Sequence, residues 1–168
     1  MTISMYQASA PRFANALKNL SAILDKAQAH AEAKKIEPAV LLQSRLYPDM
    51  FPLLRQIQIA SDSAKGPVAR LAGVEVPKYE DTEETIADLK ARLAKTIDFV
   101  SSFKPAQIDG SEDKDITLKF GTTEMPFKGM QYLLGFSLPH FYFHVTTAYN
   151  ILRHNGVEIG KMDYIGNS

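Results

Sequence analysis

The 168-residue sequence contains no cysteine and no tryptophan, and its 19 basic side chains are balanced by 19 acidic ones. The lack of cysteine excludes a disulfide scaffold, a thiolate metal site and a cysteine nucleophile. The zero net charge argues against nucleic-acid binding, whose affinity comes mainly from lysine and arginine side chains that contact phosphate. A chain of this length buries enough apolar surface to fold without cross-links. We therefore expect a single domain over residues 1–168 and no nucleic-acid partner.

Long hydrophobic runs are also absent. The most apolar stretch, residues 132–145, is interrupted by Gly135 and Pro139 and is too short to span a bilayer. The first six residues lack the basic and apolar regions of a signal peptide. The sequence therefore predicts a cytoplasmic protein with no membrane partner.

Apolar residues instead recur at spacings of three and four in four segments, which is the pattern of amphipathic helices. The four stripes are Phe13, Leu17, Leu20, Leu24, Ala27 and Ala31; Leu54, Ile57, Ser61, Ala64, Val68 and Leu71; Ile86, Leu89, Leu93, Ile97 and Val100; and Leu134, Leu138, Phe141, Val145, Ala148 and Leu152. Four such helices predict a mainly α protein, an up-down-type four-helix bundle.

Local signals predict where these helices bend, begin and end. Pro67 predicts a kink in the second helix, and Gly73 predicts its end. The third helix is expected to begin at a capping box formed by Asp81 and Glu84, with Thr82 as the alternative cap.

Between residues 116 and 127 the period changes from helical to two, which is typical of β-strands. Apolar residues alternate with polar ones on both sides of a turn at Gly121, and they are Ile116, Leu118, Phe120, Met125 and Phe127. This pattern predicts a small β-hairpin before the last helix. Because an isolated hairpin is marginally stable in water, we expect it to lie on the bundle.

His140 and His144 are the strongest chemical feature of the sequence. A spacing of four places both imidazoles on one face of the helix expected at residues 129–155, close enough to bind one divalent ion. Pro139 precedes the pair and Gly135 lies four residues earlier, so we expect a helix distortion that turns the pair toward a cavity. The same spacing is also found for two buried histidines that serve only as hydrogen-bonding groups.

Residues 140–144, with Leu152-Arg153 and Gly156 behind them, resemble the last helix of the DinB-like superfamily. Residues 45–50 and 156–161 are similar, more narrowly, to a bacterial branch known only as a domain of unknown function. The resemblance implies a four-helix bundle, which in several members binds metal or handles thiols. It also implies a metal held by two histidines of the last helix and a third on the second helix.

That third histidine is missing, because the sequence has none between His30 and His140. The side chains that could replace it are Asp62, Gln58, Gln56 and Asp49. The metal, if bound, is expected to be zinc or nickel, since imidazole suits both ions.

Two functions remain open, and the sequence does not decide whether the protein is an enzyme. The first is a non-catalytic homodimeric binding or stress-related module with structural histidines, a small-molecule ligand between the helices and an exposed apolar hairpin that forms the dimer. The second is a metal-dependent hydrolase or thiol transferase with a divalent ion at His140 and His144. No catalytic residue is assigned.

Overall fold

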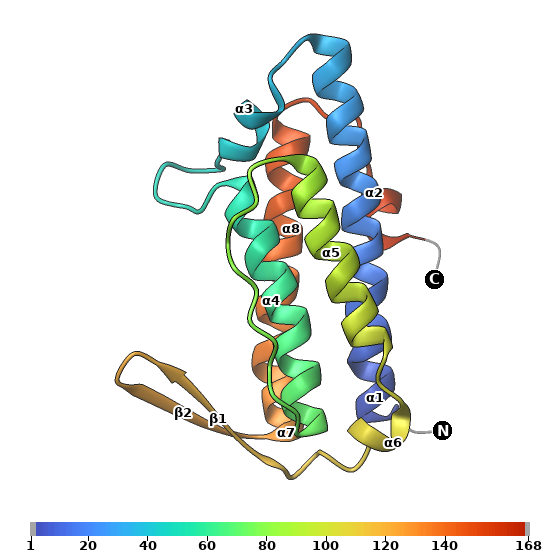
Figure 1. Cartoon of the computed structure of the whole chain (residues 1–168), viewed down its shortest axis with the longest axis vertical. Coiled ribbons are helices and arrows are strands. Elements are labelled where there is room, and N and C mark those ends of the chain that lie inside the picture. Colours follow the sequence, from blue (N-terminus) through green and yellow to red (C-terminus); the bar gives the residue numbers. More distant parts are fainter. Residues whose placement is uncertain (1–2, 167–168) are drawn as a thin grey trace.

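The computed structural model describes residues 3–166, except for the side chain of Phe120, and shows the expected mainly helical fold (Figure 1). In this part of the chain four long helices form a bundle: α2 (Ala10–Lys34), α4 (Leu53–Ala72), α5 (Ile86–Ser101) and α8 (Leu138–His154). The short helices are α1 (Met5–Ala8), α3 (Pro38–Gln43), α6 (Pro105–Ile108), α7 (Gly129–Gln131) and α9 (Lys161–Ile165). The expected hairpin, β1 (Asp115–Phe120) and β2 (Thr123–Lys128), precedes the last long helix.

The long helices follow an up-down-down-up order. Helix α2 packs against α5, α5 against α4, and α4 against α8. Figure 1 shows that α4 and α5 run in the same direction, opposite to α2 and α8. This order is possible because residues 74–85, which we call the strap, return from the end of α4 to the start of α5 without forming a helix.

The apolar stripes form the core of the bundle, as expected. All six stripe residues of α2 are 0% exposed, and α2 ends at Lys34 with Lys35 in the left-handed conformation. Helix α4 continues through Pro67 to Ala72, and Gly73 ends it with a φ of 75°. No helix within residues 3–166 combines the length and the apolar composition needed to cross a membrane.

Helix α5 begins later than its sequence indicates. The capping box is formed by Thr85 and Asp88, and the predicted box of Asp81 and Glu84 is wrong. Asp81 belongs to the strap, where it pairs with Arg92 of α5. The carboxylate of Asp81, which the local sequence predicted to cap α5, therefore forms a long-range ion pair instead.

The expected distortion before His140 is a π-helical segment, η1 (Tyr132–Ser137), which runs directly into α8. A π-turn holds one more residue than an α-turn, so it shifts the buried face of the preceding residues by one position. Leu133 is therefore 0% exposed, whereas Leu134, predicted to be in the core, is 52% exposed.

The hairpin projects from one end of the bundle (Figure 1), with Ile116 opposite Phe127 and Leu118 opposite Met125. Its first strand faces the bundle, since Ile116 and Leu118 are buried, while Met125 on the second strand is exposed. The hairpin thus leaves less apolar surface exposed than expected. Gly129 joins it to the helix, where any Cβ would overlap the backbone oxygen of Ser111.

Candidate functional site

The structure brings His140 and His144 into direct contact on α8. Their Nε2 atoms are 3.2 Å apart, and the rings meet edge to face with centroids 4.8 Å apart. His144 is buried at 6% exposure, and His140 lies at the surface of the bundle. The distortion at η1 lies directly before this pair, as the Gly135 and Pro139 positions predicted.

The other nitrogen of each ring contacts α4. His144 Nδ1 lies 2.7 Å from Gln56 Oε1, and His140 Nδ1 lies 3.1 Å from Ser63 Oγ. Gln56 is itself held, because its side-chain amide nitrogen donates to the carbonyl oxygen of Phe51 at 3.0 Å. Both histidines are thus tied to α4 by polar side chains that face them.

These contacts fix the direction of every proton in the site. Since the Gln56 amide donates to Phe51, its oxygen faces His144, and His144 Nδ1 must carry the hydrogen. His144 Nε2 is then an acceptor, so His140 Nε2 donates to it and His140 Nδ1 accepts from the Ser63 hydroxyl. We call this series, from Ser63 through His140, His144 and Gln56 to the Phe51 carbonyl, the histidine relay.

Both imidazoles are held in the neutral form. Burial, with smaller contributions from His140 and the Arg55 guanidinium, lowers the pKa of His144 to about 4. Burial also lowers the pKa of His140 below its ordinary value. The relay therefore consists of neutral hydrogen-bonding groups at neutral pH.

The candidate third ligands do not converge on the two Nε2 atoms. Gln58 bonds to Arg55 and Glu83, and Asp62 pairs with Lys65 and Arg92. Asp49 lies in the exposed loop before α4. Gln56 does reach the pair, but on the Nδ1 side of His144.

The site therefore fits a metal only in part. Two nitrogens on one tetrahedral zinc, each about 2.0–2.1 Å from it, lie about 3.3 Å apart, close to the spacing of the two Nε2 atoms. A hydrogen bond on Nδ1 is also the usual support of a metal-bound histidine. However, residues 3–166 contain no group of three histidine, aspartate or glutamate side chains placed to hold an ion.

A pocket of about 280 Å³ opens beside His140, between α4 and η1. Its walls include Ser63 and Arg70 from α4 and Tyr132, Phe136 and Ser137 from η1. Sequence reasoning missed this pocket. Residues 132, 136, 140 and 144 are spaced by four. This spacing is the sequence signal that could have predicted the side of the pocket formed by η1 and α8.

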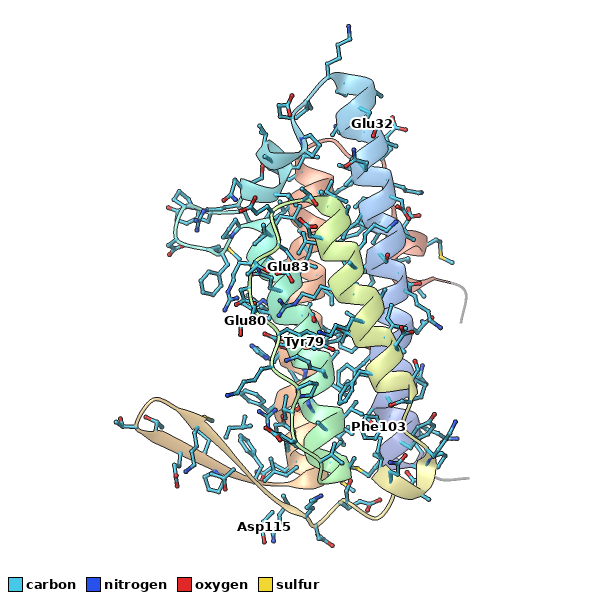
Figure 2. The ribbon with its side chains drawn as sticks, in the orientation of Figure 1. Glu32, Tyr79, Glu80, Glu83, Phe103 and Asp115 are labelled. Carbon is cyan, nitrogen blue, oxygen red and sulfur yellow. The ribbon has the colours of Figure 1, made fainter. Side chains whose placement is uncertain are left out.

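A larger hollow of about 590 Å³ lies between the strap and α5. Figure 2 labels Tyr79, Glu80 and Glu83 of the strap, which lie beside α4 and α5. Arg92 binds Glu83 and the Glu80 carbonyl, and Lys95 stands 4.2 Å from the centre of the Tyr79 ring. These interactions hold the strap in place, so we regard the hollow as a part of the scaffold.

Residues 5–165 match the family described as a domain of unknown function (DUF1993). A solved structure described as a DinB family member protein from Shewanella denitrificans is 43% identical, covers 97% of this chain and 92% of that chain, and superimposes with a TM-score of 0.88. The chain belongs to the DinB family, as a DUF1993 protein. No curated protein matches it.

Membership in the DinB family confirms the resemblance and the bundle fold inferred from the last helix. In this DUF1993 protein the two histidines of that helix are present and in contact. Two side chains of α4 reach them, Gln56 at His144 and Ser63 at His140, and neither is the third histidine that the resemblance implied.

Proposed function

We propose that this DUF1993 protein is a non-catalytic ligand-binding bundle and that its histidine pair forms part of a pocket wall. One observation carries the proposal: all four ring nitrogens of His140 and His144 have hydrogen-bonding partners within the protein. A polar network in which every group has a partner rigidifies a site, and here it includes the buried ring of His144. The relay thus holds α8 to α4 at the edge of the pocket.

The charges near the pair support this function. The guanidinium of Arg55 is close enough to disfavour a second positive charge on His144. Asp62, the carboxylate that lines the pocket, is already paired with Lys65 and Arg92. Two neutral imidazoles beside a guanidinium attract a divalent cation less than a site with a free carboxylate does.

A metal-dependent hydrolase or thiol transferase is the second candidate, and the 3.2 Å separation of the two Nε2 atoms favours it. His140 and His144 would hold a zinc or nickel ion, with Gln56 orienting His144 from the far side of its ring. His140 would then turn its proton to Nδ1 and donate it to Ser63. When bound, the ion would lower the pKa of a water or thiol.

Metal analysis of the full chain, purified without a histidine tag, separates the two candidates. We expect less than stoichiometric zinc or nickel after reconstitution with either ion, and the same content in His144→Ala as in the wild type. The matched control is His154→Ala, an exposed histidine at the end of the same helix. Stoichiometric metal that is lost in His144→Ala and kept in His154→Ala would replace the first proposal by the second.

Nitrogen NMR of the metal-free protein gives an independent reading. The relay predicts that His144 carries its proton on Nδ1 and His140 on Nε2. Addition of zinc is expected to leave both ring patterns unchanged. The opposite tautomer of His144 would contradict the relay.

A further inference from the structure

Arg70 is one of the two arginines that line the pocket beside His140, and it is held in position. Its Nη1 donates to the hydroxyl of Tyr132 at 3.0 Å. It also lies over Gly66, where a Cβ would be 2.6 Å from Nη1, so the glycine leaves the space that the guanidinium occupies.

No carboxylate within residues 3–166 neutralises Arg70. The other charged groups of the pocket are compensated: Arg55 pairs with Asp81, and Asp62 pairs with Lys65 and Arg92. Among the described residues, the one side-chain hydrogen bond of Arg70 goes to the phenol of Tyr132. A guanidinium fixed in this way can donate its remaining N–H groups to an anion. It binds planar anions such as carboxylates best, because two parallel hydrogen bonds can form.

Beside this cation stands an aromatic wall. The rings of Tyr132 and Phe136 stack with centroids 6.1 Å apart and an angle of 15°, and the Phe136 and His140 rings are 5.5 Å apart. Leu118 of the hairpin and Pro67 of α4 add apolar surface to the same pocket. Such a lining favours a flat, mostly apolar group over a hydrated inorganic ion.

Ser137 adds an unsatisfied polar atom to this lining. It is 2% exposed, and its hydroxyl has no hydrogen-bond partner among the described residues. A serine at this depth normally bonds to protein or to ordered water, because an unpaired buried hydroxyl is destabilising. Ser137 lies in the π-helical segment and lines the pocket, where an ordered water or a polar ligand atom would satisfy its hydroxyl.

We propose that this pocket binds a small aromatic carboxylate, with the carboxylate on Arg70 and the ring against Phe136 and His140. The volume of about 280 Å³ suits a ligand of this size, since pockets for drug-sized molecules start at about 300 Å³. This inference rests on the proposed binding function and names its ligand class. It needs no metal and no chemical step.

Isothermal titration of the full chain with benzoate tests the proposal. We expect saturable binding of one benzoate per chain. Benzamide, which keeps the ring and lacks the charge, and acetate, which keeps the charge and lacks the ring, should each bind at least about tenfold more weakly, since a charge-assisted hydrogen bond or a buried ring carries that much affinity. No saturable binding of benzoate, or equal binding of benzamide or of acetate, would overturn the proposal.

Variants locate the site. Arg70→Gln is expected to weaken benzoate binding about tenfold or more, because it removes the charge and keeps most of the side chain. The matched control Arg153→Gln changes an exposed arginine at the end of α8 and should bind as the wild type does. Arg70→Lys, which keeps the charge, should bind between the two and serves if Arg70→Gln fails to fold. Unchanged binding in a folded Arg70→Gln or Arg70→Lys would place benzoate elsewhere and overturn the assignment.

The two proposals fail separately. Stoichiometric metal at the histidine pair would overturn the non-catalytic function whatever the benzoate result is. If the metal-free protein does not bind benzoate, only the proposal that the ligand is an aromatic carboxylate is overturned.

Discussion

At the scale of single residues, the protonation of His144 makes the stability of the fold depend on pH. Its pKa is about 4 in the folded protein, because burial disfavours the charged ring, whereas a histidine in an unfolded chain titrates near 6.5. The unfolded state therefore binds a proton more readily between these values. The stabilising contribution is complete above about pH 6.5 and is lost as the pH falls toward 4.

We predict that His144→Gln flattens this acid dependence. The wild type should lose about 3 kcal/mol of unfolding free energy between pH 7 and pH 4 through this residue. The glutamine variant has no ring to protonate and should lose correspondingly less over that range. Urea unfolding at a series of pH values measures the difference. His154→Gln is the control and should keep the wild-type profile; a wild-type profile in His144→Gln would contradict the assignment.

At the scale of elements, the strap depends on one buried arginine. Arg92 of α5 bonds to Glu83 at 3.0 Å and to Asp62 of α4 at 2.9 Å, and its side chain is 2% exposed. Burial alone would lower the pKa of Arg92, but the bonds to these carboxylates outweigh it and raise the pKa above its ordinary value. The arginine therefore stays charged and fastens the strap across two helices.

We predict that Arg92→Met destabilises the protein by about 3 kcal/mol, because it leaves the carboxylate of Glu83, whose side chain is 11% exposed, without its cation. The strap should also loosen, which trypsin cleavage after Lys78 would detect. The control is Lys90→Met on the same helix, whose exposed pair with Asp25 is worth at most about 1 kcal/mol. If Arg92→Met is no less stable than Lys90→Met, the strap is held by other contacts.

At the scale of the whole molecule, the homodimer stays a prediction, and the hairpin exposes less apolar surface for it than the sequence indicated. The strand residues Ile116 and Leu118 are covered by the bundle, whereas Met130, Leu134 and Phe143 are 47%, 52% and 55% exposed. Met130 and Leu134 are four residues apart and lie on the same side of this helical segment, and neighbouring exposed apolar side chains are typical of an association surface.

We propose that this helical surface forms the dimer. Light scattering of the wild type should give the mass of two chains, and the double variant Met130→Lys with Leu134→Lys should give one, since two charges in a dimer core are unfavourable. Val40→Lys, at an exposed valine of α3, is the control and should remain dimeric. A monomeric wild type would refute the dimer, and a dimeric double variant would refute this surface.

The sequence alone was enough to predict the four helices, the hairpin before the last of them, the distortion ahead of His140 and the pairing of the two histidines. Each is encoded by neighbouring residues: a period of 3.6, a period of two, a proline behind a glycine, or a spacing of four. The absence of cysteine likewise restricted any metal to histidine and oxygen ligands.

Tertiary structure decided which distant side chains meet. Asp81 pairs with Arg92 and does not cap a helix. The π-helical segment turns Leu134 out of the core. Gln56 contacts Nδ1 of His144 and not Nε2, the nitrogen that faces His140. Tertiary structure also placed Arg70, which no carboxylate of residues 3–166 neutralises, beside an aromatic wall. Such contacts depend on the return path of the strap and on how α4 faces α8, which no local pattern encodes, because a helix stripe fixes the face that is buried and not the partner that buries it.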